Sequence, residues 1–234
     1  MTKKSQADPR IKIAGFQKNS FIDFPGKIAA VVFLGGCNLA CHYCHNNKIL
    51  AQSSNTLDFA DVLKELQEQI GFIDGVVISG GEPTQHPHLK YIVRAIKNLG
   101  LLVKLDTNGT NSQILKDIAV DFIAMDIKAP LEKYTAVTCA ETETAEIQES
   151  IKFLLTGKTD YMFRTTLSPY LNETDIRQIG ELIRGAKCFH LQQFVRNEFS
   201  DSHPIVLWPH SKETAKKFEK LLLKYCTKVV LRGF

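Results

Sequence analysis

Short apolar runs alternate with amphipathic segments along most of this chain. The runs are rich in β-branched residues, as in IAAVVFL at 28–34 and GVVIS at 75–79, and such runs predict buried strands. In the intervening segments apolar residues recur with a helical period. The predicted strands are 28–34, 75–79, 101–106, 121–127, 160–167, 188–194 and 228–233. The predicted helices are 57–70, 88–99, 172–183 and 211–225.

This alternation of strands and helices predicts βαβ units with right-handed crossovers and a parallel sheet. About six such units give the predicted fold class, an α/β fold with a partial (β/α)6-type TIM barrel. An open doubly wound sheet is the alternative, because the pattern does not show whether the sheet closes. We expect residues 1–10 to form a flexible N-terminal tail and residues 11–234 to form a single domain.

Composition narrows the classes of function. The 234 residues are 44% hydrophobic and carry a formal net charge of +4, so the chain can bury a large core. Lysine and arginine are scattered without a basic block, which argues against a nucleic-acid partner. No apolar segment is long enough for a signal peptide or a membrane span, so we expect a cytoplasmic protein without a membrane partner.

Three of the six cysteines lie close together after the first predicted strand. Cys37, Cys41 and Cys44 are spaced C-x3-C-x2-C, whereas a structural zinc site needs four ligands. A Cys3His zinc site, with His42 or His45 as the fourth ligand, stays open as an alternative and would indicate a non-enzymatic module. An iron–sulfur cluster normally takes four cysteines, so three would leave one iron without a protein ligand. The other cysteines are expected to be small buried side chains: Cys139, Cys188 and Cys226.

Polar residues also follow the other predicted strands at their carboxyl ends, where α/β barrels carry their chemistry. Each motif taken alone is compatible with a simple turn or a structural ion pair. Their shared position, beside a cluster of thiols, favours a functional site. These motifs are GGEP at 80–83, DTNGT at 106–110 and MDIK at 125–128, followed by Arg164 and His190.

The cysteine spacing, with Tyr43 before the last cysteine and GGEP after the next strand, resembles the signature of the radical SAM superfamily. The resemblance implies a radical SAM domain over residues 11–234. It implies one 4Fe–4S cluster whose open iron chelates S-adenosylmethionine (SAM). The implied cluster ligands are Cys37, Cys41 and Cys44. The implied SAM-binding residues here are Tyr43, Gly80, Gly81, Glu82 and Pro83.

The segment SFIDFPGK at 20–27, together with GGEP, DTNGT and MDIK, is similar to the activases of glycyl radical enzymes over about residues 11–195. It is most similar to activating proteins of anaerobic ribonucleoside-triphosphate reductase. That likeness implies reductive cleavage of SAM to a 5′-deoxyadenosyl radical, which generates a glycyl radical on a partner enzyme. It also implies flavodoxin or ferredoxin as the reductant.

Two alternative functions stay open beside this one. One is activation of another glycyl radical enzyme, of the pyruvate formate-lyase type. The other is a small-molecule radical SAM enzyme such as 7-carboxy-7-deazaguanine synthase, although a cysteine loop ending in CDT is expected there and Cys44 is followed here by His45.

The same likeness implies roles for further residues. Asp126 and Lys128 are the implied catalytic pair, touching the SAM carboxylate or the substrate backbone, and Arg164 and His190 lie on strands that contact SAM in the activases. The pair Asp106 and Thr107 is implied to bind SAM and to help hold a monovalent cation. The segment 196–210, with Trp208, is either a docking surface for the partner or a packed connection.

Overall fold

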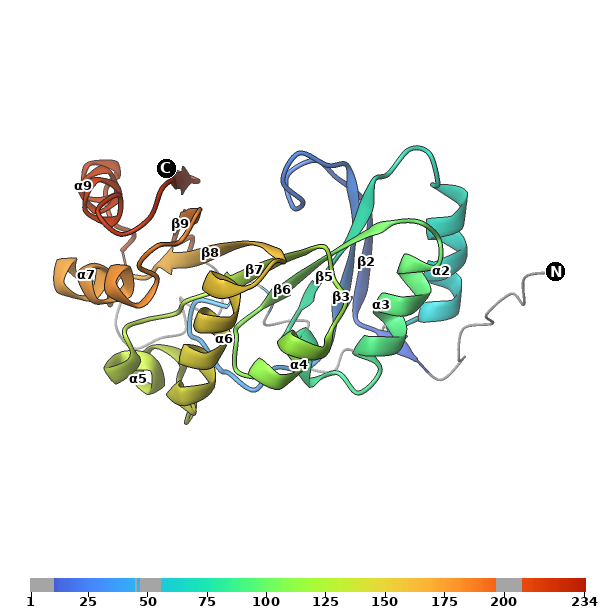
Figure 1. The fold of residues 1–234 in the computed structure, drawn as a ribbon, viewed down its shortest axis with the longest axis horizontal. Helices are drawn as coiled ribbons and strands as arrows, with labels where there is room; N and C mark the ends of the chain where they lie inside the picture. The colour runs from blue at the N-terminus through green and yellow to red at the C-terminus, as the bar shows by residue number, and fades with distance from the viewer. Residues whose placement is uncertain (1–10, 45, 47–55, 197–207) are drawn as a thin grey trace. The chain divides into compact units, whose positions relative to one another are not determined.

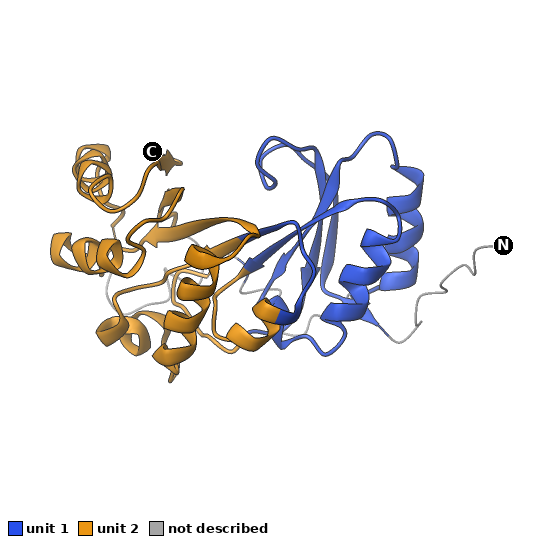
Figure 2. Ribbon diagram, viewed as in Figure 1, with its two compact units in different colours: residues 1–37, 46–106, 117–123 blue, residues 38–45, 107–116, 124–234 orange. Residues whose placement is uncertain are grey.

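The computed structural model describes residues 11–44, 46, 56–196 and 208–234. The predicted tail at 1–10, the alternative ligand His45 and most of the segment 196–210 lie outside the described residues. The chain divides into two compact units, coloured in Figure 2. Whether residues 11–234 act as a single domain stays a prediction. Unit 1 comprises residues 1–37, 46–106 and 117–123, and unit 2 comprises residues 38–45, 107–116 and 124–234.

Unit 1 contains strands in the hydrogen-bonded order β6-β5-β3-β2 (Figure 1). Strands β3, β5 and β6 are parallel, whereas β2 pairs antiparallel with β3 at the edge. A short antiparallel pair, β1 with β4, precedes the first long helix. The strands are β1 (Lys12–Ile13), β2 (Gly15–Ser20), β3 (Ala29–Leu34), β4 (Leu57–Asp58), β5 (Gly75–Gly80) and β6 (Leu102–Thr107). The helices are α2 (Phe59–Glu68), α3 (Leu89–Lys97) and the 3-10 turn η1 (Pro83–Gln85).

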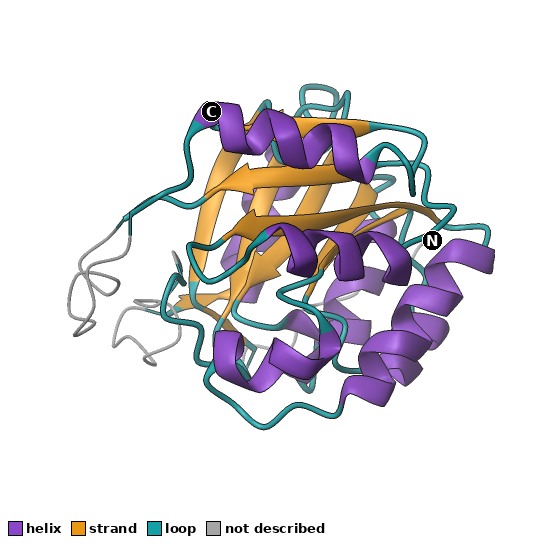
Figure 3. Ribbon diagram, turned by 90° about the vertical axis from the view of Figure 1, so that its left-hand side faces the viewer, coloured by secondary structure: helices purple, strands orange, loops and turns teal. Residues whose placement is uncertain are grey.

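Unit 2 continues the alternation of strands and helices, which Figure 3 shows by colour. Strands β8, β9 and β10 are parallel, and helix α7 packs against α9. Helix α7 starts at a capping box in which Asn172 and Asp175 bond each other's backbone N–H groups. The strands are β7 (Phe122–Asp126, which begins in unit 1), β8 (Asp160–Leu167), β9 (Phe189–Gln193) and β10 (Val229–Arg232). The helices are α4 (Ser112–Asp117), α5 (Tyr134–Thr138), α6 (Thr144–Thr156), α7 (Glu173–Leu182), α9 (Lys212–Leu222) and the 3-10 turn η2 (Leu131–Lys133).

The apolar core of unit 1 explains why its central strands read as continuous hydrophobic runs. Parallel strands are covered on both faces, so consecutive residues of β3 and β5 are buried. On one face, Val31 and Val77 pack in a cluster with Phe24 and Ala29. Lys104 is the register partner of Val77 on the neighbouring strand, so a lysine belongs to this otherwise apolar face.

The predicted α/β fold with a mostly parallel sheet is confirmed, without a closed barrel among the described residues. Every predicted strand and helix is present, with small differences at the ends. The antiparallel strand β2 was not predicted, because its residues are largely exposed and lack an apolar run. Helix α6 was also not predicted. Within the described residues, no helix is both long and apolar enough to cross a membrane.

Candidate active site

The backbone that enters the cysteine loop runs beside the GGEP segment in unit 1. The N–H of Gly81 donates to the carbonyl of Leu34 at 2.9 Å, and the N–H of Glu82 donates to the carbonyl of Gly36 at 2.8 Å. Strand β3 ends at Leu34, and Gly36 then adopts a positive φ of 82° that favours glycine. The two motifs recognised in the sequence are therefore joined by backbone hydrogen bonds at the carboxyl ends of β3 and β5.

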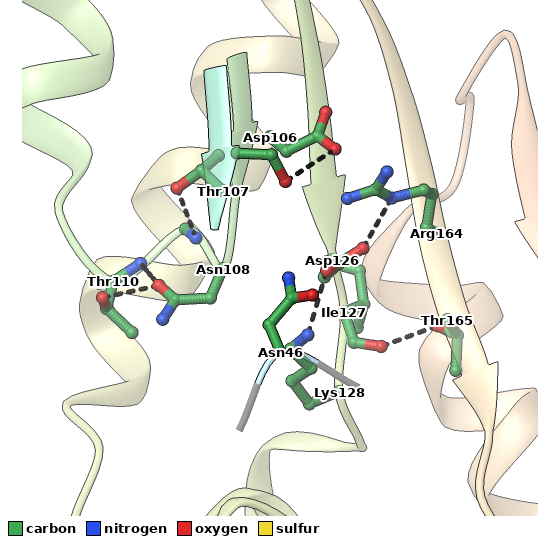
Figure 4. A network of polar contacts seen from close by, with 12 residues as sticks. Asn46, Asp106, Thr107, Asn108, Thr110, Asp126, Ile127, Lys128, Arg164 and Thr165 are labelled. Carbon is green, nitrogen blue, oxygen red and sulfur yellow. Dashed lines mark hydrogen bonds and ion pairs between the residues drawn. The ribbon is translucent and has the colours of Figure 1, made fainter. Parts of the chain in front are cut away.

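Gly80 is required by this close approach. Its φ is 121°, and a Cβ atom there would lie 2.2 Å from the carbonyl oxygen of Leu34. The side-chain amide of Asn46 donates to the carbonyl of Gly80 at 2.7 Å, which ties the residue two positions after Cys44 to the end of β5 (Figure 4 labels Asn46). Asn46 was not among the predicted site residues. Its position two residues after the cysteine motif was the signal that the sequence offered.

Glu82 is almost fully buried, with 1% of its surface exposed. Its carboxylate accepts hydrogen bonds from the backbone N–H of Thr84 at 3.0 Å and from the Thr84 hydroxyl at 2.6 Å. Pro83 is the first residue of the 3-10 turn that this carboxylate caps. The Glu82 side chain thus stabilises the turn that follows it, while Leu34 and Asn46 hold the Gly80–Gly81 backbone.

The last two residues of β6, Asp106 and Thr107, have different partners. The carboxylate of Asp106 accepts the Ser79 hydroxyl at 3.4 Å and forms an ion pair with Lys104. The hydroxyl of Thr107, which is buried, accepts the N–H of Gly109 at 3.1 Å and so closes a turn. Asp106 is therefore held by its own strand and by the end of β5, while the Thr107 hydroxyl has a local structural role.

A ring of side-chain hydrogen bonds fastens the cysteine loop in unit 2. The amide of Asn108 donates to Asn38 at 2.9 Å, and the amide of Asn38 donates to the Thr110 hydroxyl at 2.9 Å. The ring is completed when that hydroxyl donates to the Asn108 carbonyl oxygen at 2.7 Å (Figure 4 shows Asn108 and Thr110). Asn38 directly follows Cys37, so the turn after β6 positions the loop. The role of Asn38 was not predicted.

The cysteine loop makes a tight turn. The N–H of Cys44 donates to the carbonyl of Cys41 at 3.0 Å, and Cys41 is buried while Cys37 and Cys44 are partly exposed. Among the described residues, no three His, Cys, Asp or Glu side chains are gathered closely enough to hold a metal ion. The assignment of the three thiols as cluster ligands stays a prediction.

Asp126 is held by two cations in unit 2. Its carboxylate accepts Arg164 Nε at 2.7 Å on one oxygen and Lys128 Nζ at 2.9 Å on the other, as Figure 4 shows for Arg164. Burial alone would raise the pKa of Asp126, but Arg164 and Lys128 outweigh it and hold that pKa well below its usual range. Burial likewise lowers the pKa of Lys128, and Asp126 more than compensates, so this pKa lies well above its usual value. All three groups are therefore charged near neutral pH.

Backbone contacts fix the geometry of this group. The N–H of Ile127 donates to the carbonyl of Arg164 at 2.7 Å, and the Thr165 hydroxyl donates to the carbonyl of Ile127 at 2.7 Å (Figure 4). The N–H of Lys128 donates to the Tyr134 hydroxyl at 3.1 Å. His190, 8% exposed, is the register partner of Arg164 on β9. Asp126, Lys128 and Arg164 are thus in contact, His190 lies beside Arg164 on the neighbouring strand, and their predicted roles toward SAM stay predictions.

Tyr43 lies in the same unit with 4% of its surface exposed. Its hydroxyl has no hydrogen-bond partner among the described residues. Burial raises the pKa of Tyr43 well above its usual value, so the hydroxyl keeps its proton and is available as a donor. A buried hydroxyl of this kind normally has a partner. Within unit 2, the thiols of Cys41 and Cys44, this hydroxyl and the Lys128 ammonium are the kinds of group that bind an iron–sulfur cluster and a charged amino-acid ligand, and their roles stay predictions.

The three remaining cysteines differ in burial. Cys226 is buried, and burial raises the pKa of its thiol to about 11. Cys188 is partly exposed, whereas Cys139 is exposed, so the expectation of three buried side chains was wrong for Cys139. The physical reason is local: Cys139 ends helix α5 in a left-handed conformation with a φ of 53°.

Comparisons with known proteins identify the family of this chain. The family model described as the radical SAM superfamily matches residues 31–183. A protein of Methanocaldococcus jannaschii named as a glycyl-radical enzyme activating enzyme is 31% identical over 230 residues, covering 94% of this chain and 95% of that one. A 7-carboxy-7-deazaguanine synthase of Neisseria meningitidis is 32% identical over 117 residues, covering 50% of this chain and 51% of that one.

Among solved structures, a domain of the pyruvate-formate lyase-activating enzyme from Bacteroides vulgatus superposes with a TM-score of 0.54 at 18% identity. The match covers 68% of this chain and 99% of that one, and at this identity it supports the fold alone.

The chain belongs to the radical SAM superfamily. Relatives that align along most of the chain are named as glycyl-radical enzyme activating enzymes, and the chain is a radical SAM enzyme of that type. Membership of the superfamily implies a 4Fe–4S cluster and SAM as cofactors.

Proposed function

We propose that this enzyme generates a glycyl radical on anaerobic ribonucleoside-triphosphate reductase. One electron from flavodoxin or ferredoxin would split SAM into methionine and a 5′-deoxyadenosyl radical, which takes a hydrogen atom from the Cα of one glycine. The observation that supports an activase is the similarity to a protein named as an activating enzyme along almost the whole chain, and the choice of the reductase rests on the resemblance of SFIDFPGK, GGEP, DTNGT and MDIK. The alignment with the deazaguanine synthase, by contrast, covers 50% of this chain.

The side chains of this site have distinct tasks in the proposal. Cys37, Cys41 and Cys44 would hold the 4Fe–4S cluster, which supplies the low-potential electron when it is bound. The Gly80–Pro83 backbone would face the methionine part of SAM. A planar guanidinium can bind a carboxylate in bidentate fashion. The Nε–H group of Arg164, however, already donates its hydrogen bond to Asp126.

Asp126, Lys128 and Arg164 would therefore bind their ligand with charges that are already present in the free protein. Lys128 has donors beyond the one that it gives to Asp126, because an ammonium carries three N–H bonds. Those donors can bind the SAM carboxylate or a backbone carbonyl of the substrate glycine. Because the pKa of Lys128 is raised, it keeps its charge throughout the physiological range.

The first test is an anaerobic assay on protein reconstituted with iron and sulfide. Dithionite and SAM are added, and 5′-deoxyadenosine is measured by chromatography. The next step adds the anaerobic reductase and measures its glycyl radical by electron paramagnetic resonance. We expect 5′-deoxyadenosine formation that needs all three loop cysteines and a glycyl radical that needs the reductase.

Three other outcomes separate the alternatives. A radical on a formate-lyase-type enzyme, but none on the reductase, would assign the other glycyl radical partner. Faster 5′-deoxyadenosine formation with a small-molecule substrate alone would favour the synthase type. A colourless protein with stoichiometric zinc and no product would refute the radical SAM chemistry for this chain.

A further inference from the structure

Among the described residues of unit 1, Lys104 is the most deeply buried charged side chain for which no role was predicted. Only 1% of its side chain is exposed, and it lies in the middle of β6. Its register partner on β5 is Val77, which is fully buried in the apolar cluster with Val31 and Phe24. Burying an ammonium group in such surroundings is costly unless a counter-charge lies within reach.

The counter-charge is Asp106, two residues further along the same strand. Alternate residues of a strand share a face, so Lys104 and Asp106 point to the same side of β6. The ammonium of Lys104 donates to one carboxylate oxygen of Asp106, and the hydroxyl of Ser79 donates to the other. The Asp106 side chain is 14% exposed, so the pair begins in the core and ends near the carboxyl end of the strand.

In unit 2, the carboxylate of Asp126 also has cations as partners. Both oxygens of Asp126 already accept donors from side-chain cations, Lys128 and Arg164. A monovalent metal cation needs several oxygen ligands that are not already neutralised. Asp106, which the resemblance implied as a ligand of that cation, therefore does not fit a free cation well.

We propose that the ammonium of Lys104 takes the place of the monovalent cation at Asp106. The positive charge that a dissociable ion would supply is then part of the chain. Lys104 acts as a positioning residue, because it orients and neutralises Asp106 without touching the reacting atoms. The proposal predicts that the enzyme is indifferent to the identity of the monovalent salt.

The inference is tested by cation binding and not by turnover, so it can fail while the proposed function holds. Cluster-reconstituted full-length protein without SAM is titrated with sodium chloride, and the sodium-23 resonance is followed by NMR. N-methyl-D-glucamine chloride keeps the ionic strength constant. Thermal unfolding is measured in the same series with sodium, potassium and N-methyl-D-glucamine.

The variants separate the possible roles of Lys104. Lys104→Met keeps the length of the side chain but removes its charge. It should create a saturable sodium or potassium site, with a Tm about 3–5 °C higher when the cation is well above its dissociation constant. The double variant Lys104→Met, Asp106→Asn removes the anion as well and should bind no sodium. The wild type and Lys104→Arg should show no cation-specific change.

Two results would overturn the proposal. Saturable sodium binding to the wild type that Asp106→Asn abolishes would mean that a free cation binds beside Lys104. A folded Lys104→Met variant that binds no cation would mean that the ammonium does not stand in a cation's place. If Lys104→Met fails to fold, the wild-type titration and Lys104→Arg still decide between a free cation and an internal one.

Discussion

Replacing Asp126 with asparagine tests the ion-pair group of unit 2. The carboxylate is 24% exposed, and its partners Arg164 and Lys128 are 15% and 17% exposed, so solvent screens these contacts only in part. An asparagine has one acceptor oxygen and an amide that would face a cation, which leaves one cation without a partner. Removing one partner of a fully buried pair costs about 3–5 kcal/mol, and partial exposure reduces this to about 2–3 kcal/mol.

This loss corresponds to a fall in Tm of about 4–12 °C for a chain of this size. The matched control is Asp58→Asn, which removes a comparably short ion pair to Lys12 at 2.6 Å whose side chains are 39% and 51% exposed. That surface pair contributes less than about 1 kcal/mol. Calorimetry or urea unfolding of the two variants measures the difference. An Asp126→Asn variant as stable as Asp58→Asn would refute the reasoning.

The dependence of the Asp126→Asn effect on pH has a definite sign. Because the pKa of Asp126 is lowered in the folded protein, its stabilisation is present above the unfolded value of about 3.9 and is lost as the pH falls toward the folded value. Because the pKa of Lys128 is raised, its contribution is complete below about 10.4 and is lost only at higher pH. The stability difference between wild type and variant should therefore be constant from about pH 5 to 9 and shrink below about pH 4.

Three further substitutions test other parts of the site. Gly80→Ala should lower the free energy of unfolding in urea by about 2–4 kcal/mol, because the new Cβ would lie 2.2 Å from a backbone oxygen. Gly100 also has a positive φ but has open space around it, so Gly100→Ala should cost only about 1–2 kcal/mol. Equal costs for the two variants would contradict the steric argument. Cys44→Ala should lose the cluster iron while Cys139→Ala retains it, and a full iron complement in Cys44→Ala would remove that thiol from the ligand set. Tyr43→Phe should leave the stability of the SAM-free protein within about 1 kcal/mol but weaken SAM binding about 5-fold in equilibrium dialysis; unchanged affinity would exclude the hydroxyl as a SAM contact.

Local patterns in the sequence were enough to predict most of the strands and helices and to propose where the site lies. Buried parallel strands must be apolar along their length, so runs such as 28–34 and 75–79 stand out from the amphipathic helices. The cysteine spacing and GGEP are contiguous motifs and could be read without any knowledge of the fold. The edge strand β2 could not be read in this way, because its exposed residues have no need to be apolar.

The partners of the charged groups were decided only by the tertiary structure. Arg164 is 38 residues from Asp126, and no local pattern pairs them; the parallel alignment of their strands does. Asn38 and Asn108 meet because the turn after β6 lies against the cysteine loop. Lys104 and Asp106 are close in sequence, but the sequence does not show that their face of β6 is buried. Because the Lys104 side chain is buried, its charge needs the counter-charge of Asp106.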